Sequence, residues 1–186
     1  MYGKFLTLCL LLFVGCRSEI SHQQSGSNVV KDASTVQTLE IKSWGNGAPA
    51  LEIDVPAGYS IKMLKGPDFD VHTIARATPQ NAGKAAEMGI YIGHYPSYSA
   101  RDKAVVEQEG RVGEQLVKWL CWETEQQGRK LYHAESLVKG FYEQAKVDSG
   151  IGGGVKRLLL HIFINGTDAD QVQALRDAAR TLRLKE

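Results

Sequence analysis

The chain has 186 residues, of which 23% are charged and 43% are hydrophobic, and its formal net charge is +1. These values are typical of one globular domain that is long enough to bury a core, with room for further segments. Because the net charge is close to zero and no long block of one sign occurs, charge offers no argument for nucleic acid or an acidic molecule as a partner.

The first fifteen residues have the composition of a secretory signal peptide. Lys4 precedes an almost wholly apolar run at 5–14. A helix of that length rises about 15 Å, whereas the core of a bilayer is roughly 30 Å thick. A charged start, a short apolar centre and a small residue at the end predict a signal peptide over 1–15. A buried strand or helix is the alternative, which the polar stretch that follows does not favour.

The apolar run ends in the tetrapeptide Phe13-Val14-Gly15-Cys16. It resembles the lipobox of bacterial lipoproteins, in which Leu, a small residue and Gly or Ala precede an invariant Cys. The resemblance implies that cleavage follows Gly15 and that Cys16 is lipidated on its sulfur. Phe13 departs from the pattern, since Leu is commonest there. An ordinary signal peptide followed by a chance cysteine is therefore the alternative.

The three cysteines, Cys9, Cys16 and Cys121, fit the lipoprotein interpretation. Cys9 would leave with the signal peptide, and acylation of Cys16 would leave Cys121 as the single thiol, so no internal disulfide could form. Lipoproteins of this class carry at least two acyl chains, and two chains make a stable anchor where one is marginal. We expect a protein of the bacterial cell envelope, held to a membrane at its periplasmic or extracellular face.

Residues 16–35 are expected to form the lipidated cysteine and a flexible tether. The segment is rich in Ser, Gln, Asn and Gly and contains few apolar residues. Such a composition cannot bury a core, and a flexible chain of this length has a mean reach of roughly 25 Å. A single folded domain is then expected over 36–186.

Short runs of alternating or β-branched residues predict strands in the first half of this domain. An Asn-Gly pair at 46–47 predicts a tight hairpin turn after the first of them. A capping-box pattern at 99–102 predicts a short helix to about residue 109. The strands are expected at 36–44, 51–55, 59–64, 69–75 and 89–95, with a loop at 78–88.

The second half is expected to contain two long strands, 114–123 and 130–138, joined by a loop of the longer type. The segment 155–164 is apolar on both faces, as expected for a strand in the middle of a covered sheet. Thr167-Asp-Ala-Asp170 reads as a helix cap, and the apolar residues that follow recur on one face of a helix. They are Val172, Leu175, Ala179 and Leu182. The predicted class is α+β, with a largely antiparallel sheet, flanking helices and an amphipathic C-terminal helix.

Two segments resemble PsbP/Mog1-like domains. One is Leu51–Tyr59, a strand that ends in Pro and then Gly-aromatic, and the other is the apolar strand, helix cap and amphipathic helix running into Thr181–Leu184. The resemblance implies an α/β/α sandwich, an antiparallel sheet with helices against both faces, over about 36–186. It also implies a non-catalytic accessory or binding role. No functional residue of the family matches closely enough to be carried over.

A thiol enzyme is the alternative function. Cys121 lies between Trp119 and Trp122 in a predicted strand, and His133 lies on the adjoining strand, where it could act as the activating base of an envelope hydrolase. The competing interpretation is a buried and inert cysteine, because free cysteine is among the most buried residue types. We therefore assign no catalytic residue.

The five histidines show no metal-ligand spacing. A site assembled from His94, His133 and Asp70 stays open, but no metal or other cofactor is predicted. His161 stands alone in an apolar strand and is expected to be a core histidine with its hydrogen bonds satisfied. Asp68 and Asp70 could do acid–base chemistry, although a solvated strand face is the expected interpretation.

The sequence 150–154 is glycine-rich but precedes a strand, so a flexible turn is expected rather than a phosphate loop. Aromatic residues gather in the second half of the chain, where they can fill a core or line a ligand pocket. We expect a non-catalytic binding or accessory domain with an envelope protein as partner. The aromatic residues are Tyr91, Tyr95, Tyr98, Trp119, Trp122, Tyr132, Phe141 and Tyr142.

Overall fold

The protein is seen in a computed structural model that describes residues 35–42, 49–65, 70–76, 85–100, 102–143 and 158–186. All of them belong to one compact unit, 32–186. The predicted signal peptide, Cys16 and the tether lie outside the described residues, as do the predicted turns at 45–48 and 150–154.

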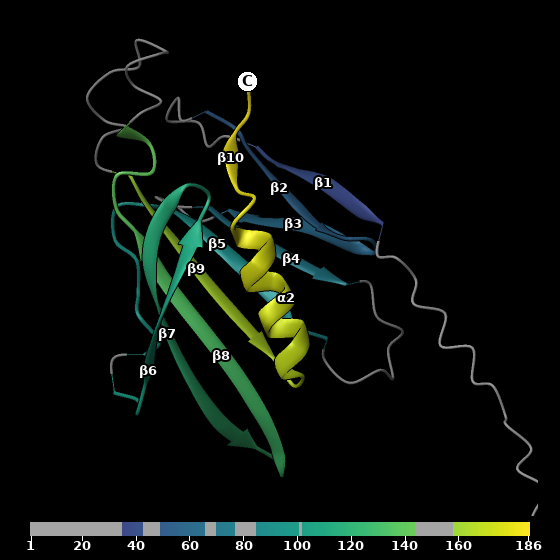
Figure 1. Ribbon diagram of the computed structural model, residues 1–186, viewed down its shortest axis with the longest axis vertical. Coiled ribbons are helices and arrows are strands. Elements are labelled where there is room, and N and C mark those ends of the chain that lie inside the picture. Colours follow the sequence, from purple (N-terminus) through teal and green to yellow (C-terminus); the bar gives the residue numbers. More distant parts are fainter. Residues whose placement is uncertain (1–34, 43–48, 66–69, 77–84, 101, 144–157) are drawn as a thin grey trace, which may run out of the picture. The chain divides into compact units, whose positions relative to one another are not determined.

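The described residues form two antiparallel sheets and a C-terminal helix (Figure 1). The larger sheet has seven strands in the order β3-β4-β5-β9-β8-β7-β6, and the smaller has three in the order β1-β2-β10. The class is therefore α+β with β-structure predominating, as predicted. The elements are β1 (Val36–Ile41), β2 (Leu51–Pro56), β3 (Tyr59–Lys65), β4 (Asp70–Arg76), β5 (Glu87–Gly93), β6 (Val106–Val112), β7 (Gln115–Gln126), β8 (Arg129–Val138), β9 (Leu159–Gly166), α2 (Ala169–Ala179) and β10 (Arg183–Leu184).

Strand β2 shows why the alternating runs form strands. Leu51, Ile53 and Val55 are buried, whereas the residues between them are half-exposed. Successive side chains of a strand point to opposite faces, so the alternation places one row in the core. The antiparallel pairing runs from Val36 opposite Pro56 to Ile41 opposite Leu51. The predicted pairing of these two strands is confirmed, although the first ends at Ile41 rather than at residue 44.

The helix predicted to follow Ser99 is wrong, because residues 106–112 form the edge strand β6 instead. The backbone N–H groups of Ser99 and Ala100 donate to the carboxylate of Glu135 at 3.1 and 3.0 Å. The backbone N–H groups at the start of the capping pattern are therefore bound to a distant side chain instead of forming a helix cap. A two-residue turn at Gly113-Glu114, with Gly113 at φ +54°, then joins β6 to β7.

The predicted longer loop between β7 and β8 is also wrong. The pairing continues to Gln126 opposite Arg129, so only two residues form the turn. Gln127 and Gly128 both have positive φ, 54° and 72°. Positive φ at both central residues matches the twist of a hairpin, and Gly128 adopts it without steric cost.

Strand β9 lies in the middle of the larger sheet, between β5 and β8, as its apolar sequence predicted. Leu160, Ile162 and Ile164 are fully buried on one face. The amphipathic helix α2 follows at once, and Asp168 caps it by accepting from the N–H groups of Asp170 and Gln171.

Helix α2 packs on the sheet through the apolar face that the sequence predicted. Val172, Leu175 and Ala179 belong to the same core cluster as the inward side chains of β9. Burial of one such aliphatic side chain stabilises the fold by about 1.5–3 kcal/mol. Figure 1 shows α2 on one side of the sheet, with β6, β7 and β8 curving beside it. The helix and these strands enclose the candidate site.

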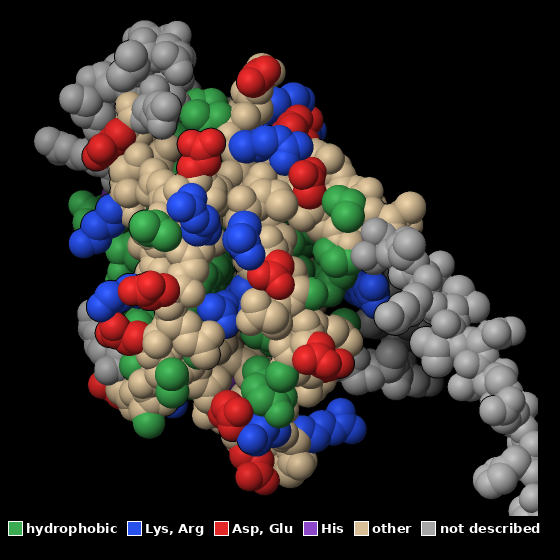
Figure 2. All heavy atoms as spheres, viewed as in Figure 1, with side chains coloured by type: hydrophobic (Ala, Val, Ile, Leu, Met, Phe, Trp, Pro, Cys, Tyr) green, Lys and Arg blue, Asp and Glu red, His purple; other side chains and the backbone are tan. Residues whose placement is uncertain are grey.

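The exposed surface carries charges of both signs. On the face seen in Figure 2, Lys and Arg side chains alternate with Asp and Glu side chains. No helix within the described ranges has the length and the apolar composition needed to cross a bilayer.

Candidate ligand-binding groove

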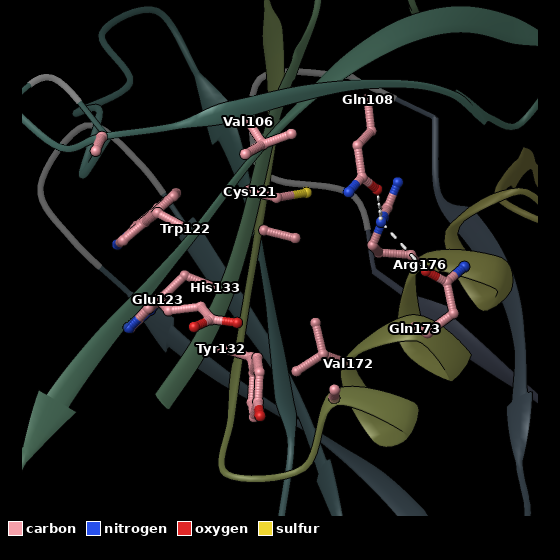
Figure 3. A pocket seen from close by; sticks show the side chains of 13 residues that line it. Val106, Gln108, Cys121, Trp122, Glu123, Tyr132, His133, Val172, Gln173 and Arg176 are labelled. Atoms are coloured by element: carbon pink, nitrogen blue, oxygen red, sulfur yellow. Dashed lines mark hydrogen bonds between the residues drawn. The ribbon is translucent and has the colours of Figure 1, made fainter. Parts of the chain in front are cut away.

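A groove of about 550 Å³ lies between α2 and the strands β6, β7 and β8 (Figure 3). Its volume falls in the range of roughly 300–1,000 Å³ that is usual for small-molecule sites. Apolar side chains contribute to its walls together with two amides, one guanidinium, one thiol, one carboxylate, one phenol and one imidazole. The lining includes Val106, Gln108, Cys121, Val172, Gln173 and Arg176.

The strand register explains which side chains face this groove. Val106 pairs with Cys121, and Cys121 pairs with Ala134, so the three residues form a row across β6, β7 and β8. Directly paired residues of antiparallel strands project from the same face of a sheet. Val172 stands on the helix and closes the groove from the other side, where it is buried. The groove therefore has an apolar floor and an apolar wall.

Arg176 is the cation that lines the groove. Its Nη1 donates to the side-chain oxygens of Gln108, at 2.6 Å, and Gln173, at 3.2 Å. Its guanidinium carbon lies 5.4 Å from the ring centroid of the buried Trp119. Its Nε is buried without a hydrogen-bond partner in the described part of the chain. Two strands and the helix thus hold the guanidinium in place.

Cys121 is half-buried, and Figure 3 shows its sulfur pointing toward Arg176 and Gln108. Burial raises the pKa of the thiol, and the positive charge of Arg176 offsets part of that rise. Because the thiolate is the nucleophilic form, a raised pKa makes the thiol a weak nucleophile at neutral pH. Cys121 is therefore half-buried rather than buried as expected, and its inertness stays a prediction.

His133 lies on the neighbouring strand but projects from the opposite face. It pairs with Trp122, whose ring stacks on the imidazole with centroids 4.9 Å apart. Its Nδ1 forms a hydrogen bond with Oδ1 of Asn165 and its Nε2 forms one with the hydroxyl of Thr124, both at 2.7 Å. Both residues border the groove, but their side chains leave the sheet from opposite faces, and both ring nitrogens of His133 are occupied.

The other predicted candidates form no metal centre in the described ranges. No group of three His, Cys, Asp or Glu side chains there could hold a metal ion. His94 is exposed, and His133 is bound to Thr124 and Asn165 as described above. Asp68 and the side chain of Asp70 lie outside the described residues, so their role stays a prediction.

His161 is a buried core histidine, as predicted. It is 3% exposed, and its Nε2 lies 2.5 Å from Oε1 of Glu135, which is fully buried. Tyr98 lies against this pair, with its ring centroid 5.5 Å from that of His161. The buried partner, Glu135, was not predicted, because nothing in the sequence of its strand marks this acid as buried.

Most of the aromatic residues fill the interior, as expected. Tyr132 is half-buried and lines the groove, whereas Tyr95 is 87% exposed. The buried members of the predicted group are Tyr91, Trp119, Trp122, Phe141 and Tyr142.

Sequence reasoning missed Arg176 and its amide partners. Arg176 follows the core residue Leu175 directly and lies one turn after Val172. The position of this arginine at the border of the apolar helix face was the one feature of the sequence that could have indicated its role. Its partner Gln108 is on β6, 68 residues away in sequence and in a segment predicted to be helical. The contact could not be anticipated from local pattern.

Comparison with known proteins gives no family for this chain. No family model and no curated protein matches it. A crystal structure from Bacteroides thetaiotaomicron VPI-5482 is similar, with a TM-score of 0.44 and 7% sequence identity over 73% of this chain. The match covers 45% of that protein, so this chain spans less than half of its length. A similarity this low transfers neither fold nor function.

Proposed function

We propose that this chain is a bacterial cell-envelope lipoprotein whose folded domain binds a ligand without catalysing a reaction. Residues 1–15 direct export, lipid on Cys16 holds the protein to a membrane, and the rest of 16–35 links the anchor to the domain 36–186. The signal pattern and the tetrapeptide ending in Cys16 support the anchor. The groove between α2 and β6–β8 is the observation that supports the binding role.

The chemistry of the groove favours binding over catalysis. The amides and the guanidinium that line it hold and orient a ligand but transfer protons poorly at neutral pH. The imidazole of His133 also borders the groove, but both of its ring nitrogens are already hydrogen-bonded. A thiol enzyme using Cys121 and His133 would need both side chains on one face of the sheet, and they project from opposite faces. Glu123, the carboxylate that lines the groove, is exposed and paired with Lys130 at 2.6 Å.

The finer proposal for the fold is a PsbP/Mog1-like α/β/α sandwich. The antiparallel seven-stranded sheet and the position of α2 on one of its faces support it. An experimental structure of the whole chain tests this proposal, which requires a second helical layer on the other face.

The anchor is tested by replacing its cysteine. Cys16→Ser should abolish labelling by an alkyne analogue of palmitate in a bacterial host and should release the protein from the membrane fraction. Cys121→Ser is the matched control and should keep both the label and the membrane location. If the unaltered protein stays with the membrane but takes up no label, the lipoprotein proposal is wrong.

The binding role is tested by filling the groove. Val106 is 62% exposed on the edge strand, so Val106→Trp adds bulk at the groove with little disturbance of the core. Native mass spectrometry of protein isolated from the cell envelope should show a bound small molecule that this variant lacks. Val36→Trp, at a 65% exposed position of the smaller sheet, should retain it. Unaltered protein that carries no ligand, and gains none from an envelope extract, would contradict the binding role.

A further inference from the structure

Arg176 forms no ion pair within the described part of the chain. The ion pairs of the described residues involve Lys118, Lys130, His161, Arg180, Arg183 and Lys185, and none involves Arg176. Its hydrogen-bond partners are the neutral amides of Gln108 and Gln173. A partly buried cation without a counterion favours an anion beside it, because removal from water makes the charge costly unless it is paired.

The guanidinium is also held in one orientation before any ligand arrives. Gln108 anchors it to β6, Gln173 anchors it to the preceding turn of α2, and Trp119 on β7 lies against it. Within the described residues its hydrogen bonds come from Nη1 alone. A guanidinium offers five N–H donors in a fixed plane, which suits a carboxylate. Fixing it in advance lowers the entropy lost when an anion binds.

The remainder of the groove suits an apolar body. Val106, Cys121 and Ala134 form the row across the strands, and Val172 faces them from the helix. A bare inorganic anion would leave this apolar surface in contact with water. The volume of about 550 Å³ leaves room for a hydrocarbon portion beside the charged group.

We infer that the groove recognises an organic anion, a carboxylate attached to an apolar body, and that Arg176 binds its charge. The inference rests on the proposed binding role of the groove and specifies the ligand class. The carboxylate lies at the Arg176 end, and the apolar body lies over Val106, Cys121 and Val172.

Cys121 makes the inference testable, because its thiol lies within the groove. Hexanoate is the probe, hexan-1-ol is the uncharged molecule with the same chain, and inorganic phosphate is the anion without an apolar body. Each is added to the full-length protein in a non-ionic detergent during alkylation by iodoacetamide. Mass spectrometry of the peptide that contains Cys121 gives the alkylation rate at that one thiol.

Hexanoate should slow the alkylation of Cys121 to a saturating limit, at lower concentration than hexan-1-ol does. Arg176→Gln should raise the hexanoate concentration needed for half-protection by about tenfold or more, as expected for the loss of a charged hydrogen bond. Arg180→Gln is the control on the same helix, because Arg180 is paired with Asp177 and does not line this groove. It should leave the protection unchanged.

A second measurement separates recognition of charge from a change in the thiol itself. Arg176 offsets part of the rise in the pKa of Cys121, so Arg176→Gln should raise that pKa further. The thiol should then react more slowly with every alkylating reagent, and to a similar degree with each. The ratio of the iodoacetate rate to the iodoacetamide rate cancels this common effect. We expect this ratio to fall several-fold in Arg176→Gln, and to be restored in Arg176→Lys.

The outcomes are distinguishable from a failure of the binding role. Equal protection by hexanoate and hexan-1-ol, unchanged in Arg176→Gln, would mean that the groove takes an apolar ligand, which overturns the inference but keeps the binding role. Protection by phosphate alone would also overturn it. No protection by any of the three, with an unchanged reagent ratio, overturns it as well, and the Val106→Trp experiment then decides whether the groove binds anything.

Discussion

Glu135 on β8 and His161 on β9 meet through Oε1 and Nε2 at 2.5 Å, and both side chains are buried. They project from the face of the sheet opposite to the core residues Ala134 and Ile162. The same carboxylate accepts from two backbone N–H groups of the segment that precedes β6. One buried acid therefore joins two central strands to the segment that leads into the edge of the groove.

Replacing Glu135 with Ala should destabilise the protein by about 3–5 kcal/mol, because it leaves His161 and two N–H groups without their partner. Glu135→Gln keeps an acceptor oxygen and should cost less. Urea unfolding followed by circular dichroism measures both. Equal losses for the two variants would show that the negative charge, rather than the acceptor oxygen, is what the site requires.

The hydrogen bond between Thr124 and His133 should contribute about 1 kcal/mol to stability, since Thr124→Val removes a hydroxyl from a partly buried ring nitrogen. Thr124→Ser retains the hydroxyl and is the matched control. The free energy of unfolding in urea gives the comparison. Because the His133 side chain leaves the sheet on the face opposite to Cys121, neither variant should alter the alkylation rate of Cys121, and a change in that rate would contradict the assignment of faces.

Gly110 should not tolerate a side chain. A Cβ atom there would lie 2.6 Å from Cδ1 of Trp119, so the indole would have to move, and Arg176 rests against that indole. Gly110→Ala should lower stability by about 1–3 kcal/mol and should weaken hexanoate protection of Cys121. In the double variant with Trp119→Phe the two stability losses should be less than additive. Fully additive losses would show that the two residues do not interact.

Acid should weaken the smaller sheet. The pKa of Asp54 is lowered from 3.8 by its hydrogen bonds to Arg183 and Thr38, and the pKa of Glu40 is lowered from 4.5 by its hydrogen bond to Lys185. Groups with lowered pKa values contribute stability that is complete above the unfolded values and is lost as the pH falls through the folded values.

Arg183→Gln should therefore reduce the difference in Tm between pH 7 and pH 3, because Asp54 then titrates closer to its unfolded value. Differential scanning calorimetry at the two pH values measures this difference. Salt at 0.5 M should reduce it in the unaltered protein as well, since exposed pairs are screened. A pH dependence that persists unchanged in Arg183→Gln would assign acid sensitivity to other carboxylates.

The local periodicity of apolar residues was sufficient to predict most of the helices and strands. The alternation of Leu51, Ile53 and Val55 identified a half-buried strand, and the spacing of Val172, Leu175 and Ala179 identified one face of the final helix. It failed after Ser99, because a capping pattern depends on free N–H groups, and there they bind the distant Glu135.

The sequence by itself determined the class of fold, the antiparallel hairpins and the amphipathic helix, because period and turn chemistry are local properties of a chain. The proposed anchor at Cys16 likewise rests on local pattern alone. Only the tertiary structure decided that Cys121 and His133 face opposite sides of the sheet, since a shift of one residue in strand register would have reversed this. It alone placed Arg176 beside Gln108 and Trp119, because that juxtaposition depends on how α2 packs across strands distant in sequence.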